Sequence, residues 1–153
     1  MQAIRTNSIR SLVALAALAA GLSLGGAARA ADSSYTYGTV WEISQIQIEP
    51  GQFENYMDWL DGAWKKIQEF SKAQGVVVSY HVLSVNDTRP GEPDLLLAIE
   101  YKDYQSTAQR VELQKKIEAM LATDTRKMES AGGERKSMRK VLGGMELQEL
   151  RLK

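Results

Sequence analysis

Two stretches decide the fold: Val76 to Val85, VVVSYHVLSV, and Leu95 to Tyr101, LLLAIEY. Both are rich in β-branched and aliphatic residues, which predicts two strands, and the segment between them, Asn86 to Asp94, has the Pro, Gly, Asn and Asp content of a loop. Because the strands are neighbours in the chain, we expect an antiparallel hairpin. Apolar residues occupy odd and even positions alike, so both faces of the sheet are expected to be buried.

A strand and a helix are predicted before this hairpin. Thr39 to Ile48 alternates in part between apolar and polar residues and stops before Pro50-Gly51. Apolar residues then recur every three or four positions, which predicts a helix that Gly75 ends. The apolar stripe of this helix consists of Phe53, Tyr56, Met57, Leu60, Trp64, Ile67 and Phe70.

A second helix and a last strand are predicted after the hairpin. The chain becomes helical again from Ser106, and Ser130 to Gly133 should interrupt that helix. Glu134 to Leu142 can form a shorter helix, which Gly143-Gly144 would end, and Met145 to Leu152 alternates as a strand.

The predicted order of strand, helix, strand, strand, helix, strand indicates an α+β, ferredoxin-like βαββαβ fold. In that fold a four-stranded antiparallel sheet carries both helices on one face. The other face has no cover within the chain, and a contiguous exposed apolar patch favours association. We therefore expect a homodimer in which two sheets pack face to face as an α/β barrel with a small internal cavity.

Residues 1–30 are predicted to be a secretory signal peptide. Arginines precede an apolar run from Leu12 to Leu24, and Ala28-Arg29-Ala30 places small residues where a signal peptidase needs them. The run is shorter than the ~20 residues of a membrane-spanning helix, so no stable membrane anchor is expected. No Arg-Arg pair precedes it, which favours the general export route and a periplasmic or secreted protein. A flexible arm over 31–38 and one domain over 39–153 should remain.

Composition excludes several classes of function. The 153 residues include 19 basic and 19 acidic side chains, one histidine and no cysteine. Disulfides, thiolate metal sites and a cysteine nucleophile are therefore excluded, and we expect neither a metal nor a cofactor. The first thirty residues contain three arginines and no acidic residue, so the remaining chain is slightly acidic and no nucleic-acid partner is expected.

Five residues are candidates for ligand binding. His81 is the only histidine, so any imidazole base has to be this residue, although an ordinary strand histidine is the alternative. Glu100 and Glu42 lie within apolar strands, where a carboxylate facing a closed barrel must be paired, hydrogen-bonded or protonated, unless water reaches it near a strand end. Tyr80 and Trp41 complete the set. His81 and Glu100 are the candidate catalytic residues.

Two other groups of residues receive structural interpretations. Trp59 lies off the apolar stripe of the first helix and is expected at an interface. Basic residues from Arg126 to Lys140 alternate with Glu129 and Glu134, which predicts a solvated helical face rather than an anion or membrane site.

The segments IEPGQFENY, WLDGAWKKI, VSYHVLSV and LLLAIEYKDY, and the closing MRKVLGGMELQELRLK, resemble small exported members of the dimeric α/β-barrel superfamily. That superfamily includes monooxygenases, haem-degrading enzymes, muconolactone isomerases and ligand-sensing domains, so the resemblance implies a fold and a dimer but not one activity. Its oxygenases use Asn, Trp and His around the cavity. Trp41 and His81 are present here, but the first strand contains no Asn, so no catalytic residue is carried over.

The leading hypothesis is an exported homodimeric barrel that binds a small apolar molecule, or serves as a scaffold, without catalysis. The alternative is a small cofactor-independent oxygenase or isomerase that uses His81, Tyr80 and Glu100, which requires polar side chains converging within about 3 Å of one reacting atom. A third possibility is an interaction module that binds a partner through the loop from Asn86 to Asp94.

Overall fold

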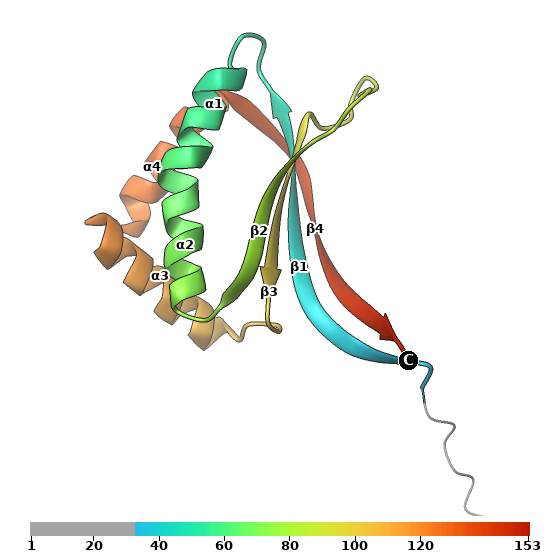
Figure 1. Cartoon of the computed structure of the whole chain (residues 1–153). Helices are drawn as coiled ribbons and strands as arrows, with labels where there is room; N and C mark the ends of the chain where they lie inside the picture. The colour runs from blue at the N-terminus through green and yellow to red at the C-terminus, as the bar shows by residue number, and fades with distance from the viewer. Residues whose placement is uncertain (1–32) are drawn as a thin grey trace, which may run out of the picture. The chain divides into compact units, whose positions relative to one another are not determined.

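A four-stranded antiparallel sheet forms one layer of the protein, with strand order β2-β3-β1-β4. The structure, a computed structural model, describes residues 33–153, so the predicted signal peptide lies outside the described residues. The strands are β1 (Tyr35–Ile48), β2 (Val77–Ser84), β3 (Leu95–Tyr101) and β4 (Arg139–Leu152). The helices lie on one side of this sheet (Figure 1). The strand order and the one-sided helices confirm the predicted α+β, ferredoxin-like arrangement.

The first helical segment runs without a break through a π turn. It consists of α1 (Phe53–Trp59), the π segment η1 (Leu60–Trp64) and α2 (Lys65–Ala73). Its buried residues are Tyr56, Leu60, Trp64, Gln68 and Ser71. Most of these residues are four positions apart, and in an α-helix of 3.6 residues per turn such positions move gradually around the helix. The π turn has more residues per turn, so it returns these side chains to the face that meets the sheet. Gly75, at φ 73°, follows the helix as predicted.

The hydrophobic core lies between this helical segment and one face of the sheet. Buried Tyr56, Leu60 and Trp64 of the helical segment pack against Ile46, Leu95 and Leu97 of the sheet. Trp59, expected at an interface, packs at the edge of this cluster. Phe53, the first residue of the predicted stripe, is exposed, so the stripe enters the core only from Tyr56 onward.

The segment after β3 differs from the prediction in two places. α3 (Thr107–Leu121) ends where Ala122 adopts φ 50°, and α4 (Thr125–Glu134) then begins, with Asp124 accepting a hydrogen bond from the Lys127 amide at 2.9 Å. A polar N-cap restarts the helix there. Gly132 and Gly133 lie inside α4 and do not end it. Each glycine lowers the stability of a helix by only about 1 kcal/mol. No helix within residues 33–153 is long and apolar enough to span a membrane.

The predicted short helix over 134–142 is wrong beyond Ser137. A single turn, η2 (Arg135–Ser137), is followed at Arg139 by β4. Arg139 pairs with Ile48, and a register shift near Gln45 lets the strand continue past Gly143-Gly144. Pairing with β1 overrides the local helical preference, and the glycines suit the bulge.

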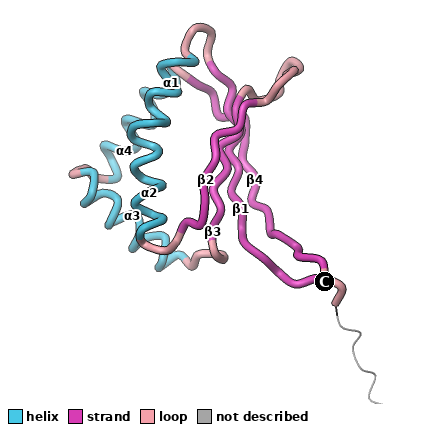
Figure 2. The backbone as a smooth tube through the Cα atoms, viewed as in Figure 1, coloured by secondary structure: helices cyan, strands magenta, loops and turns pink. Residues whose placement is uncertain are grey.

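Part of the segment predicted as a flexible arm pairs with the last strand. Tyr35 pairs with Leu152 and Tyr37 pairs with Leu150, so these residues belong to β1. β3 pairs with β1 only from Val40 to Ile46. Figure 2 shows β1 and β4 continuing beyond β2 and β3 as a two-stranded ribbon. Residues 35–37 are extended because β4 is long enough to pair with them.

Candidate functional site

One face of the sheet is covered by helices and the other is not. Side chains alternate between the faces of a strand, so the neighbours of the core residues Ile46, Leu95 and Leu97 point away from the helices. The register places one set of apolar residues side by side on this second face. We call it the open face; its apolar residues are Trp41, Ile43, Leu83, Leu96, Ala98, Met145 and Leu147. No helix of residues 33–153 covers it (Figure 1).

The open face leaves large apolar side chains in contact with water. Leu83, Met145 and Leu147 are 48%, 40% and 43% exposed. They come from β2 and β4, on opposite edges of the sheet, and Ile43 and Leu96 on the inner strands lie between them. The apolar surface therefore crosses all four strands.

His81 and Trp41 lie together on the open face. Their rings are stacked, with centroids 6.2 Å apart and an interplanar angle of 17°. β3 runs between their strands, and its buried Ala98 is paired with His81. The small alanine side chain leaves room for the two rings to meet across the strand. Within residues 33–153, the His81 side chain makes this ring contact but no side-chain hydrogen bond.

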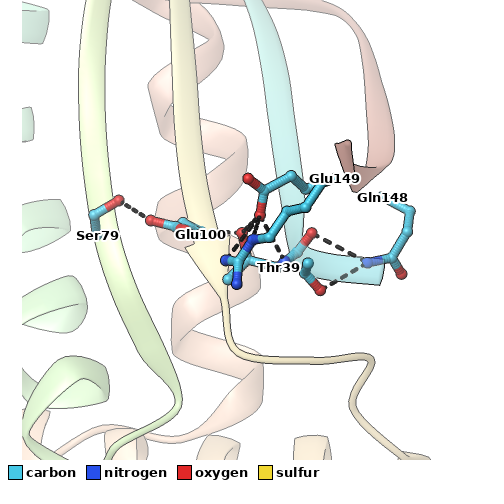
Figure 3. Close-up of polar contacts among 7 residues, drawn as sticks. Thr39, Ser79, Glu100, Gln148 and Glu149 are labelled. Carbon is cyan, nitrogen blue, oxygen red and sulfur yellow. Dashed lines mark hydrogen bonds and ion pairs between the residues drawn. The ribbon is translucent and has the colours of Figure 1, made fainter. Parts of the chain in front are cut away.

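Glu100 belongs to a cluster of polar side chains on the same face, shown in Figure 3. One carboxylate oxygen accepts a hydrogen bond from Thr39 Oγ1 at 2.8 Å, and the other accepts one from Ser79 Oγ at 2.6 Å. Glu149 accepts hydrogen bonds from the Thr39 amide at 3.1 Å and from Arg151 Nε at 3.0 Å. The pKa of Glu149 is lowered, chiefly by the hydrogen bond from Arg151.

This cluster holds Glu100 as a fixed acceptor. Both of its oxygens are engaged by hydroxyl groups, and Figure 3 shows these groups arriving from different strands. His81, by contrast, has a ring contact but no orienting hydrogen bond. Within residues 33–153, no hydrogen bond joins His81 to Glu100, whose oxygens are bonded to Thr39 and Ser79. Within residues 33–153, no three His, Asp or Glu side chains converge as metal ligands.

Tyr80 and Glu42 lie on the helix-covered face. The Tyr80 hydroxyl donates a hydrogen bond to Glu69 of α2, and its ring meets Trp64 edge-on at 5.4 Å. Glu42 accepts a hydrogen bond from the Tyr101 hydroxyl at 3.2 Å. Burial, and then the charge of Glu42, raise the pKa of Tyr101.

The structure thus divides the five candidate residues between the two faces. It brings Trp41, His81 and Glu100 together on the open face and places Tyr80 and Glu42 opposite them. Sequence reasoning missed Thr39 and Glu149, which hold the polar cluster together. Thr39 is the first residue of the predicted domain. Glu149 lies close to Thr39 only because β1 and β4 pair over a long stretch. No local signal in the sequence marks that proximity.

The loop from Asn86 to Asp94 is tied to the sheet at its end. Asp94 Oδ2 accepts a hydrogen bond from the Ile48 amide at 2.7 Å, and the Asp94 amide donates to the Ile46 carbonyl at 2.8 Å. Arg89 and Glu92 form an ion pair at 2.9 Å within the loop. An open cavity of about 350 Å³ lies beside Asp94, and it contains none of the five candidate residues.

Comparisons with known proteins are distant. No model of a protein family matches the sequence, and no curated protein matches it. A NipSnap family protein of unknown function from Agrobacterium tumefaciens aligns at 14% identity, covering 76% of this chain and 90% of that one, with a TM-score of 0.42. PA3566 from Pseudomonas aeruginosa aligns at 14% identity over 76% of this chain and 96% of that one, also with a TM-score of 0.42. The class assigned here, an α+β protein with a four-stranded antiparallel sheet, rests on the strands and helices themselves.

Proposed function

We propose that two copies of this chain pack open face to open face as a homodimeric α/β barrel, and that the barrel holds a small apolar molecule. The observation that carries this proposal is the apolar surface across all four strands. Burial of a Leu or Met side chain contributes about 1.5–3 kcal/mol. The exposure of Leu83, Met145 and Leu147 therefore favours association with a surface that buries them. A second copy brings an identical surface through a two-fold axis, which needs no other partner.

The distribution of polar groups suits a binding chamber. Ligand sites are mostly apolar, with a few polar groups that orient the ligand. Trp41 and Ile43 would supply apolar wall, the His81 ring would lie level with Ile43, and the Glu100 cluster would lie toward one end beside Trp41. A ligand with an apolar body and a single polar group fits this arrangement.

The dimer is tested by placing charge on the open face. We expect the purified protein to sediment as a dimer, and the double variant Met145→Lys, Leu147→Lys to sediment as a monomer, because four lysines would meet in the interface of each dimer. Val111→Lys is the matched control: Val111 on α3 is also apolar and 49% exposed, but α3 lies on the helix side of the sheet. A monomeric wild-type protein at high concentration would contradict the dimer.

The ligand and the compartment are tested together by native mass spectrometry of the protein taken from its own cells. We expect a dimer of chains that begin at Ala31, carrying an added mass that is released on denaturation. A dimer without added mass would contradict ligand binding. A chain that retains residues 1–30 would contradict export with cleavage, and with it the proposed periplasmic or secreted location.

The enzymatic alternative is supported less well. A cofactor-independent oxygenase or isomerase using His81, Glu100 and Tyr80 needs these groups around one reacting atom, and Tyr80 faces α2 instead. The variant His81→Ala tests whether His81 contacts the ligand that native mass spectrometry is expected to recover. Unchanged binding of that ligand would show that His81 takes no part in binding it.

A further inference from the structure

Two arginines are held on aromatic rings of the core, on the helix side of the sheet. The Arg135 guanidinium carbon lies 4.4 Å from the centroid of the Trp59 ring, and that of Arg139 lies 5.7 Å from the Tyr56 ring. The two rings are stacked, with centroids 5.5 Å apart. Cation–π contacts of this kind fix the guanidinium groups in place. We call these four residues the arginine cluster.

The positive charge of this cluster is offset only in part, by the nearby charge of Glu134 on Arg135. Among residues 33–153, neither arginine forms an ion pair with an Asp or Glu side chain. Burial lowers the pKa of Arg135, and the charge of Arg139 lowers it further, so the two cations are close enough to repel each other. Partly buried cations without a counter-ion are costly. The interpretation of residues 126–140 as a solvated helical face therefore fails at these two positions.

Buried polar atoms without partners lie in the same cluster. The Nε atoms of both arginines are covered and have no hydrogen-bond partner within residues 33–153. The Tyr56 hydroxyl is covered as well; burial raises its pKa, and the nearby Arg139 guanidinium lowers it. Tyr56 itself is 0% exposed. Such atoms are rare in native proteins and indicate an absent partner. This observation is independent of the charge imbalance.

Gly132 of α4 lies beside the Arg135 guanidinium. A Cβ at Gly132 would lie 3.6 Å from Arg135 Nη2, in direct contact with it. Both arginines are partly exposed.

We propose that Arg135 and Arg139 bind a phosphate group through their guanidinium groups. Guanidinium groups match the oxygens of phosphate in pairs of parallel hydrogen bonds, and a phosphate monoester carries about −1.5 to −2 charge, which balances two arginines. A carboxylate carries only one negative charge. The site lies on the helix side of the sheet and does not depend on the proposed barrel.

The test is a titration of the full mature protein with inorganic phosphate, followed through the NMR signals of the arginine Nε–H groups. We expect the Arg135 and Arg139 signals to shift together and to saturate, at constant ionic strength. Arg139→Gln should weaken binding about tenfold or more, because it removes a charge-assisted pair of hydrogen bonds. Lys136→Gln removes the same charge from an exposed neighbour and should change the affinity less than about twofold.

Three outcomes would overturn the proposal. The first is the absence of a saturable shift up to about 50 mM phosphate, because a dissociation constant above that concentration is too weak for a functional site. The second is an equal shift with acetate or chloride, which would make the site a general anion contact. The third is equal weakening by Lys136→Gln. If Arg139→Gln does not fold, the wild-type titrations with phosphate, acetate and chloride still decide. Titration with glycerol phosphate distinguishes a phosphate ester from the free ion as the preferred ligand.

Discussion

Single residues on this sheet have roles that the alternation of a strand only partly reveals. Alternation alone places His81 with Ser79 and Leu83, and Tyr80 with Val82. It does not say which set meets the helices. Packing decides that, because Trp64 of the helical segment reaches Tyr80 and not His81.

The Tyr101 hydroxyl predicts a specific dependence of stability on pH. Its pKa is raised from 10.0 by burial and by Glu42, so above pH 10 the folded protein keeps a proton that the unfolded chain loses. The stability from this group is complete below pH 10 and falls as the pH rises further, by up to about 1.4 kcal/mol per pH unit. Tyr101→Phe should therefore flatten the alkaline decline of the free energy of unfolding.

This prediction is checked by urea denaturation between pH 8 and 11. The slope is compared rather than the absolute value, since the variant also loses the hydrogen bond to Glu42. The pKa of Tyr56 is raised too, by burial, so some slope should remain in Tyr101→Phe. An unchanged slope in the variant would show that Tyr101 ionises normally in the folded protein.

At the scale of elements, the π turn in the first helix explains how a four-residue spacing stays on one face. It also contains a glycine with no structural need. A Cβ at Gly62 would meet nothing within 4 Å, and its φ is not in the left-handed region. By contrast, Gly75 adopts φ 73°, where a side chain is strained.

These two glycines give opposite predictions for the same substitution. Gly62→Ala should raise the free energy of unfolding by about 0.5–1 kcal/mol, because alanine restricts the unfolded chain and favours a helix. Gly75→Ala should lower it by about 1–2 kcal/mol. Thermal and urea unfolding measure both. Destabilisation by Gly62→Ala would mean that the π turn needs a glycine.

The elements that the sequence predicts best are those with strong local signals. The hairpin strands, with apolar runs bounded by Gly and Pro, are found within one residue of the predicted ends, and β3 matches from Leu95 to Tyr101. The start of β4 was missed because its residues Arg139 to Leu142 have no strand pattern of their own. They are strand only because Ile46 to Ile48 of β1 offer an unpaired edge.

For the whole molecule, an apolar interface predicts that the proposed dimer resists salt. Screening weakens contacts between exposed charges, with a Debye length near 10 Å at 0.1 M and about 3 Å at 1 M salt, but it leaves apolar burial largely unaffected. The dimer dissociation constant should therefore change less than about threefold between 0.1 and 1 M NaCl, as measured by sedimentation. Dissociation at high salt would indicate an ionic interface and contradict packing through the open face.

The sequence by itself determined the α+β class, the hairpin, the first helix and the apolar character of both sheet faces, because each depends on local composition and on periods of two or 3.6 residues. Tertiary structure alone decided the length of β4, the ribbon it forms with Tyr35 to Tyr37, the meeting of Glu100 with Thr39, and the stacking of Arg135 on Trp59. These depend on which segments, far apart in the chain, lie side by side, and no local pattern records the strand register or packing that brings them together.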